Sequence, residues 1–272
     1  MNKIVRQIAT VLLSVPVLLS VAACGGKQPE EIDPPETATA ATLPASQEPS
    51  DVQTMLIMSL ADYQVPGSVK TLRNDRQVDF IMLMTIDADA NTTTAVQIDP
   101  DIAVPFQHQG AAKAEIMPLG EVFTYGSGGS DSNLNILMAV SKLMDHVKID
   151  HYMTFDADSV SIMTDMLGGV TVNITDSFPE AYPELAKGGS VCLDGKNADV
   201  FFNYVAPEDR DNTSHMRRQQ EFIRGVYGPF SSSAGQEEFV TQLSMKLGEK
   251  MNTDLTLSQM LKLMEALQEY KL

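Results

Sequence analysis

Apolar residues in this chain gather in short runs, separated by longer segments of mixed polarity. Runs at residues 54–60 and 79–87 predict strands buried on both faces, and an alternating run at 92–99 completes a hairpin with the second of them. Further strands are predicted at 149–155 and 170–174. Strands that alternate with helices in this way are typical of an α/β or α+β sandwich.

Amphipathic segments predict the helices. The helix from Asp131 to Val147 places most of its apolar side chains on one face, which we expect to be buried: Leu134, Leu137, Met138, Val140 and Met144. The helix at 156–169 has acidic residues suited to capping its start, and Gly168 lies past its end. Other helices are predicted after a turn within 193–205, and at residues 214–227, 236–250 and 256–270.

Many residues of the first apolar runs are methionine. Buried methionines most simply form an ordinary core. Because the methionine side chain repacks easily, the same residues would also suit a pliable wall around a flexible apolar ligand.

The first 52 residues differ in character from the rest of the chain. Residues 1–23 have a basic start and an apolar run that ends in "LLSVAAC", a pattern that predicts a bacterial lipoprotein signal peptide with Cys24 as the acylated residue. A transmembrane anchor is the alternative, but the run is shorter than the ~20 residues that a span needs. Residues 24–52 are rich in Pro, Ala, Thr and acidic residues, which predicts a disordered tether. The remainder, 53–272, is long enough for one sizeable domain.

Charge and cysteine content narrow the possible functions. A formal net charge of −17 argues against nucleic-acid binding and against docking of the protein surface on anionic lipids. With Cys24 acylated, Cys192 is the one other cysteine, and its place in an alternating run predicts a buried structural thiol. No two histidines have metal-ligand spacing, and no "G-x-S-x-G" motif of a serine hydrolase is present.

A series of short sequence segments gives a more specific indication of the protein family. In chain order they are "VDFIMLMTID", "VQIDPDIAVPF", "FTYGSGG", "IDHYMTFDADSVSIMTDMLGGVTVNI", "VCLDGKNADVFFNYV", "RRQQEFIRG" and "NTDLTLSQMLKLM". Their order resembles the LytR-CpsA-Psr family of Gram-positive cell-envelope proteins, over roughly residues 54–270. The resemblance implies a three-layer α/β/α sandwich with a central mixed sheet and an apolar lipid tunnel.

The resemblance also implies an activity. Members of the family transfer a glycopolymer, such as teichoic acid, from a polyprenyl-pyrophosphate carrier to peptidoglycan, through a phosphodiester. Arginines hold the pyrophosphate and acidic residues hold Mg²⁺, as the chemistry of phosphoryl transfer requires. The implied partners are the polyprenyl-linked glycopolymer, peptidoglycan and the membrane, and the implied location is the extracellular face of the cytoplasmic membrane, through a lipid anchor.

Three aspartates match the family's acidic positions. Asp62 and Asp79 match the first two, and we expect them to hold Mg²⁺; Asp79 and Asp101 are the expected catalytic carboxylates. For Asp62 and Asp79 the alternative is that they are solvated turn residues.

The family's arginines are matched less completely. Arg218 and Gln219 match the family's Arg-x-x-Arg-Gln element and His215 stands at its first arginine, so these three are expected to bind pyrophosphate near a helix N-terminus. Arg76 and Arg210 lie close to other arginine positions and are expected to assist. Four positions have lost the family's arginine: Gln77, Pro100, Ala206 and Glu208.

These losses leave more than one function open. Three alternatives follow. The first is a working or weakened envelope glycopolymer transferase, the second is a non-catalytic lipid-binding or scaffolding lipoprotein, and the third is an extracellular interaction domain with a solid core. Since a hydrogen bond to a charged group contributes about 1.5–3 kcal/mol, the four losses would remove on the order of 5–10 kcal/mol of phosphate stabilisation.

Overall fold

The computed structural model describes residues 52–63, 73–207, 209, 212–234 and 237–269. All of them belong to one compact unit, Glu48–Leu272. The predicted signal peptide, Cys24 and the tether up to residue 51 lie outside the described residues, as do Glu208 and Arg210. Within the described part, no helix is both long enough and apolar enough to cross a membrane.

A mixed five-stranded sheet forms the centre, with the strand order β3-β2-β1-β6-β9. Strand β1 pairs antiparallel with β2 and parallel with β6, while β2–β3 and β6–β9 are antiparallel pairs. The predicted hairpin and the strand near 149–155 are confirmed. The strands are β1 (Val52–Asp62), β2 (Arg76–Asp87), β3 (Thr92–Ile98), β6 (His151–Asp156) and β9 (Met251–Thr253).

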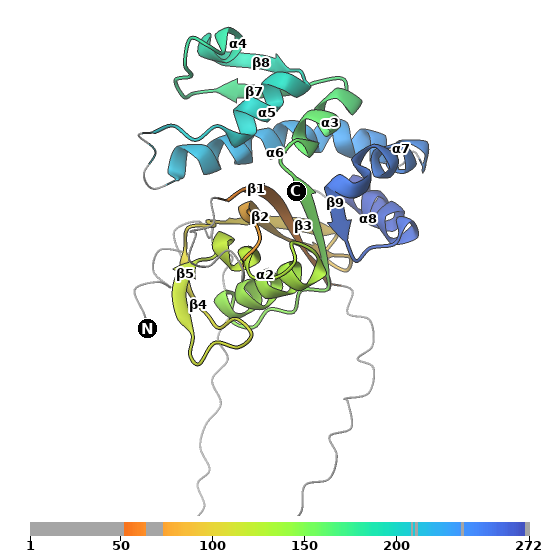
Figure 1. The fold of residues 1–272 in the computed structure, drawn as a ribbon. Helices are drawn as coiled ribbons and strands as arrows, with labels where there is room; N and C mark the ends of the chain where they lie inside the picture. The colour runs from red at the N-terminus through yellow and green to blue at the C-terminus, as the bar shows by residue number, and fades with distance from the viewer. Residues whose placement is uncertain (1–51, 64–72, 208, 210–211, 235–236, 270–272) are drawn as a thin grey trace, which may run out of the picture. The chain divides into compact units, whose positions relative to one another are not determined.

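Two hydrophobic cores cover the two faces of this sheet. The first lies against helix α2 (Ser130–Leu143), the turn η3 (Gly120–Thr124) and the hairpin of β4 (Ala103–Phe106) and β5 (Glu115–Pro118). The second lies against the remaining helices, and Figure 1 shows α6 and α2 on opposite sides of the sheet strands. The helices of the second layer are α3 (Ser159–Met166), α5 (Gly195–Asn203), α6 (Thr213–Ala234), α7 (Glu237–Leu247) and α8 (Leu257–Glu269).

Strand alternation explains why β1 is apolar almost throughout. Leu56, Met58 and Leu60 pack into the first core, while Met55 packs into the second. A strand covered on both faces buries both sets of alternate side chains. The predicted three-layer sandwich with a central mixed sheet is therefore confirmed, whereas the lipid tunnel remains a prediction.

A smaller hairpin lies over α5 and α6. It joins β7 (Val170–Ile174) to β8 (Gly189–Leu193), with the short helix α4 (Pro183–Ala186) between them. Gly168 has a φ of 75°, as its predicted place past the end of helix α3 requires. Cys192 is exposed, so the prediction of a buried thiol is wrong. Residues alternate along β8, and Cys192 lies on the face opposite to the buried Leu193.

The buried face of α2 also differs from the prediction. Leu134 and Met138 are 56% and 53% exposed, so they do not belong to the core face. The buried residues are instead Ser132, Asn133, Ile136 and Val140. The buried polar residues have partners: the Asn133 carbonyl accepts a hydrogen bond from Thr154 Oγ1 at 2.6 Å, and its amide donates to Asn252 at 2.9 Å. The core face of α2 therefore includes polar residues that the apolar pattern alone does not mark.

Candidate functional site

Asp79 occupies an irregularity in the sheet. Ser59 of β1 pairs with Phe80 and Leu60 pairs with Val78, so Asp79 is the extra residue of a β-bulge in β2. Bulges of this kind redirect a side chain and are common beside active sites. Gly120 of η3 packs next to the bulge, where a Cβ atom would meet the Val78 carbonyl oxygen at 2.2 Å. A side chain at residue 120 would therefore displace the strand that carries Asp79.

His215 of α6 lies against Asp79. The imidazole is fully buried, and its Nε2 atom lies 3.5 Å from Oδ2 of Asp79. Nε2 is also 2.8 Å from the Phe202 carbonyl oxygen, and Nδ1 is 3.0 Å from Oδ1 of Asn212. Nε2 also lies 3.2 Å from the side-chain nitrogen of Gln219. His215 is thus held by several polar groups with its ring against the carboxylate of Asp79.

Gln219 completes the contact between the helix and the bulge. Its side chain is fully buried and donates to the backbone carbonyl of Asp79 at 3.4 Å. It also accepts a hydrogen bond from Gln97 of β3 at 2.8 Å. His215 and Gln219 are four residues apart on one face of α6, so both reach the sheet. We call Asp79, His215 and Gln219 the bulge cluster.

Acidic residues at the end of β3 lie next to the bulge cluster. The Asp101 backbone N–H donates to Oδ1 of Asp99 at 3.0 Å, and the Asn212 amide donates to the same oxygen at 3.4 Å. Asp209 accepts hydrogen bonds from the backbone N–H groups of Ser214 and His215, which it caps at the start of α6. The loop after β3 and the start of α6 are therefore joined through polar side chains.

Two carboxyl groups of this region have raised pKa values. Burial raises the pKa of Asp79, and the charge of Asp101 adds to the rise, while His215 opposes it. Burial also raises the pKa of Asp101, followed by the negative charge of Asp99. In both cases burial outweighs the attraction of His215. Perturbed carboxyl groups in one region are characteristic of functional sites.

Asp62 and Arg76 lie in a different cluster. The Asp62 side chain is 96% exposed and lies 3.9 Å from Arg76, which also pairs with Asp156 at 2.8 Å. Asp62 is directly opposite Arg76 in the sheet, whereas Asp79 is three residues further along β2, or about 10 Å at the usual rise per residue. The structure therefore does not bring Asp62 and Asp79 together.

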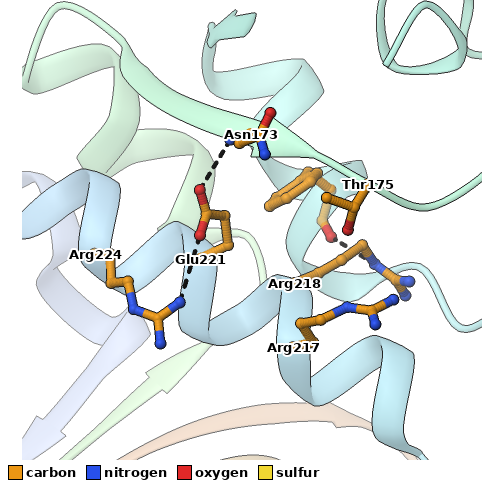
Figure 2. Close-up of a pocket in the computed structure, with 7 residues that line it drawn as sticks. Asn173, Thr175, Arg217, Arg218, Glu221 and Arg224 are labelled. Atoms are coloured by element: carbon orange, nitrogen blue, oxygen red, sulfur yellow. Dashed lines mark hydrogen bonds and ion pairs between the residues drawn. The ribbon is translucent and has the colours of Figure 1, made fainter. Parts of the chain in front are cut away.

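Arg218 does not face Asp79. Its guanidinium is 4% exposed, pairs with Asp176 at 2.7 Å and donates to the carbonyl oxygens of Phe201 and Tyr204. It also stacks over the rings of Phe178 and Tyr204. Figure 2 shows this side chain beside Arg217, on the β7 side of the helix. Arg218 of α6 therefore pairs with Asp176, whereas His215 and Gln219 of the same helix contact Asp79.

The described residues contain no group of three or more His, Cys, Asp or Glu side chains that would hold a metal ion. Asp79 and Asp101 are nevertheless close enough for the charge of Asp101 to raise the pKa of Asp79. Mg²⁺ in phosphate-handling sites is commonly held by one or two carboxylates together with phosphate oxygens and waters. Asp79 and Asp101, rather than Asp62 and Asp79, are therefore the carboxylates that would hold Mg²⁺, and the metal itself remains a prediction.

Several residues of the site were missing from the sequence-based prediction. Asn212, Asp209 and Gln97 hold His215 and Gln219 in place, and Asp176 holds Arg218. The one usable signal was Asp209, an acidic residue shortly before a predicted helix. The partners in the pairs Gln97–Gln219 and Asp176–Arg218 lie 122 and 42 residues apart in the chain. No short sequence motif therefore indicates either contact.

The model of the LytR_cpsA_psr family matches residues 23–271. The chain belongs to this family. Among similar proteins, the polyisoprenyl-teichoic acid–peptidoglycan teichoic acid transferase TagU of Bacillus subtilis is 26% identical over 152 residues, which cover 55% of this chain and 45% of TagU. The biofilm regulatory protein A of Streptococcus mutans is 23% identical over 167 residues, or 59% of this chain and 40% of that protein. The chain spans about half the length of the curated relatives that it matches.

Solved structures of the family share the fold. B. subtilis TagV superposes with a TM-score of 0.63 and 20% identity, covering 81% of both chains. TagT bound to LI-WTA superposes with a TM-score of 0.59 and 16% identity, covering 81% of this chain and 76% of TagT. These likenesses show that the chain shares the fold of TagV and TagT.

Proposed function

We propose that this family member transfers a cell-envelope glycopolymer from a polyprenyl-pyrophosphate carrier to peptidoglycan. The observation that carries the proposal is the bulge cluster. There the partly buried carboxylate of Asp79 contacts His215, and the backbone carbonyl of Asp79 accepts from Gln219. A second carboxyl group with a raised pKa, Asp101, lies beside it. The transferase name of the relative TagU supports the substrate class.

In this proposal the acceptor hydroxyl of peptidoglycan attacks the phosphorus atom that is bonded to the glycopolymer. A new P–O bond forms, the P–O bond of the pyrophosphate bridge breaks, and polyprenyl phosphate leaves. Asp101, whose pKa is raised by partial burial, accepts the hydroxyl proton. Mg²⁺ at Asp79 and Asp101 would supply charge neutralisation for the phosphates. The ring of His215 orients Asp79.

The transfer is expected to be slow. Among the described residues, Arg76 is paired with Asp156 and Asp62, and Arg218 with Asp176, so these arginines are already held by carboxylates of this chain. Gln77, Pro100 and Ala206 offer no cation at the family's other arginine positions. Phosphoryl transfer depends on positioned positive charge, and the site has little of it.

The test is turnover of a polyprenyl-pyrophosphate-linked disaccharide with purified peptidoglycan, followed by release of polyprenyl phosphate in the presence and absence of Mg²⁺. We expect Asp101→Asn to slow release by about 10²–10⁴-fold, the usual contribution of a positioned base. Asp145→Asn, in the turn after α2, is the matched control. The proposal fails if the wild-type chain releases no more product than a reaction without protein, or if Asp101→Asn and the control behave alike.

A second candidate function is retention of a lipid without catalysis. Ser59 Oγ, Thr93 Oγ1 and Gln97 Oε1 are buried without a hydrogen-bond partner in the structure. Their cross-strand partners Phe80, Ile86 and Met82 belong to the second core, so all three oxygens face the same layer between the sheet and the helices. Buried polar atoms are normally satisfied, so this line of acceptors favours a ligand or water in that layer. Five buried methionines of the same core would let it adapt: Met55, Met82, Met84, Met153 and Met260.

Native mass spectrometry of the purified chain distinguishes these candidates. A retained polyprenyl phosphate with no turnover would favour lipid binding alone, and turnover would favour the transferase. A chain that retains no lipid and shows no turnover would contradict both and leave an interaction domain. We also propose that the chain acts at the extracellular face of the cytoplasmic membrane, anchored through an acylated Cys24. Fatty-acid labelling that persists in Cys24→Ser would contradict this anchor.

A further inference from the structure

A pocket lies on the side of α6 that faces away from the bulge cluster. It has a volume of about 120 Å³ and lies between α6 and β7, as Figure 2 shows. His215 and Gln219 face the sheet, while residues two positions further along the helix point to the opposite side. The lining residues are Asn173, Thr175, Phe201, Arg217, Arg218, Glu221 and Arg224.

The pocket concentrates positive charge in an acidic protein. The whole chain has 19 Lys and Arg residues against 36 Asp and Glu. Three arginines line this one pocket, and the carboxylates that pair with them are Asp176 and Glu221. The three arginines and their two carboxylate partners therefore have a net charge of +1. In a chain of net charge −17, such a pocket is a local exception that would attract an anion.

Buried contacts fix the pocket wall. Arg218 is 4% exposed and holds Asp176, whose other oxygen pairs with Arg217. Glu221 accepts a hydrogen bond from the Asn173 backbone N–H at 2.9 Å, which ties α6 to β7. Because Asp176 and Glu221 are held by the protein, the arginines beside them are positioned before any ligand binds.

Arg217 and Arg224 retain donors for a ligand. Each guanidinium has five N–H donors. Their side chains are 55% and 68% exposed, and the pair between Arg224 and Glu221 is long, at 3.5 Å. Figure 2 shows Arg217 beneath Thr175 and Arg224 on the other side of Glu221. Seven residues of helix separate them by about 10 Å. Two cations at this spacing suit two negative charges of one extended ligand better than a single phosphate.

We propose that this pocket binds an extended polyanion with repeated phosphodiester groups, one held at Arg217 and the next at Arg224. The identity of the polyanion rests on the proposed function, since a phosphate-containing glycopolymer would be the substrate at the bulge cluster. Arg218 is a positioning residue that orients Arg217 through Asp176. The pocket gives the polymer a second attachment on the far side of α6.

Equilibrium binding to the full chain tests the proposal. The probes are a short poly(glycerol phosphate), inorganic phosphate, and an oligogalacturonate of matched charge. We expect the phosphodiester oligomer to bind more tightly than inorganic phosphate. Arg217→Gln and Arg224→Gln should each weaken oligomer binding by about tenfold, the equivalent of one charge-assisted hydrogen bond. Lys142→Gln, on the outer side of α2, removes the same charge elsewhere and should change binding by less than about twofold. Salt should weaken binding to the wild-type chain.

Three outcomes would overturn the proposal: no oligomer binding at low salt, equal binding to the two arginine variants and the Lys142→Gln control, or equal binding of inorganic phosphate and the oligomer. Tighter binding of the oligogalacturonate would overturn the assignment to phosphodiesters. Transfer activity is measured separately. If the wild-type chain binds the oligomer through Arg217 and Arg224 but transfers nothing, the proposed function fails and this site stands; if it transfers polymer but the variants bind normally, this site fails and the function stands.

Discussion

The Asp79 carboxylate lies 3.5 Å from the buried imidazole of His215, although 136 residues separate them in the chain. The bulge in β2 supplies the carboxylate, and the capped first turn of α6 supplies the ring. Their contact joins the central sheet to the helical layer. It is weak support for stability, because partial burial of the Asp79 carboxylate is costly. Its placement is better explained by function.

Asp79→Asn is predicted to make the protein more stable at neutral pH. Burial raises the pKa of Asp79 above that of the unfolded chain, so the folded state binds the proton more tightly. The resulting stabilisation is present below the unfolded pKa and is lost as the pH rises through the folded pKa. The ionised carboxylate is therefore the unfavourable form, and asparagine removes it.

Thermal unfolding at two pH values measures this effect. The Tm of Asp79→Asn should exceed that of the wild-type chain at pH 7.5, and the difference should shrink as the pH falls through the raised pKa of Asp79. Asp62→Asn changes a 96% exposed side chain and should leave the free energy of unfolding within about 0.5 kcal/mol. A Tm for Asp79→Asn below that of the wild-type chain would show that the attraction to His215 outweighs burial.

Asp99→Asn is predicted to shift the pH dependence of transfer. Burial raises the pKa of Asp101, and the negative charge of Asp99 raises it further. Removal of that charge should lower the pKa, so the acidic limb of kcat/KM against pH should move to lower pH. Asparagine retains the oxygen that accepts the Asp101 N–H, so the local backbone is kept. Asp145→Asn is the control. If the acidic limb of the pH profile of kcat/KM moves equally in both variants, the role of Asp101 as the base is contradicted.

Two glycines of α6 are predicted to respond differently to alanine. A Cβ atom at Gly225 would lie 2.5 Å from the Thr171 carbonyl oxygen and 2.8 Å from Val170 Cγ1, whereas at Gly228 it would meet no other element within 4 Å. Gly225→Ala should destabilise by about 1–3 kcal/mol because α6 must move away from β7. Gly228→Ala should change the free energy of unfolding by less than about 1 kcal/mol, because the gain in helix propensity is opposed by crowding against the ring of Pro229. Urea unfolding measures both values, and a stabilised Gly225→Ala would show that the helix and the hairpin are not in close contact.

The sequence predicted the elements whose signal is local. Period-two alternation and long apolar runs marked the strands that pack between two layers, and Gly168 marked a helix end with a positive φ. The exposed Leu134 and Met138 show the limit of this approach. The face of α2 is set by the bonds of Asn133 to Thr154 and Asn252, and no pattern within the helix indicates them.

The same limit applies to the candidate site. The family motif selected His215 and Gln219 for pyrophosphate binding, which remains a prediction, and the structure places both against Asp79. The motif did not indicate that the neighbouring Arg218 would turn towards Asp176, because a helix separates adjacent residues by about 100° and the partner comes from the end of β7. The bulge at Asp79 was also hidden, since "VDF" is compatible with a regular strand.

Restoration of two family arginines is predicted to increase transfer. Gln77 and Ala206 stand at arginine positions of the family and are partly exposed in the structure, so a longer side chain has room at both. One charge-assisted hydrogen bond contributes about 1.5–3 kcal/mol, and each 1.4 kcal/mol is tenfold in rate. Since such contributions are not additive, we expect Gln77→Arg combined with Ala206→Arg to raise single-turnover release of polyprenyl phosphate by about 10–100-fold.

A matched control separates this effect from general electrostatic attraction. Gln107→Arg adds a positive charge at an exposed position just after β4 and should change the rate by less than about threefold at moderate salt. The gain of the double variant should also depend on the bulge cluster, so adding Asp101→Asn should abolish it. If the double variant transfers no faster than Gln107→Arg, or keeps its gain without Asp101, then missing arginines are not what limits this site.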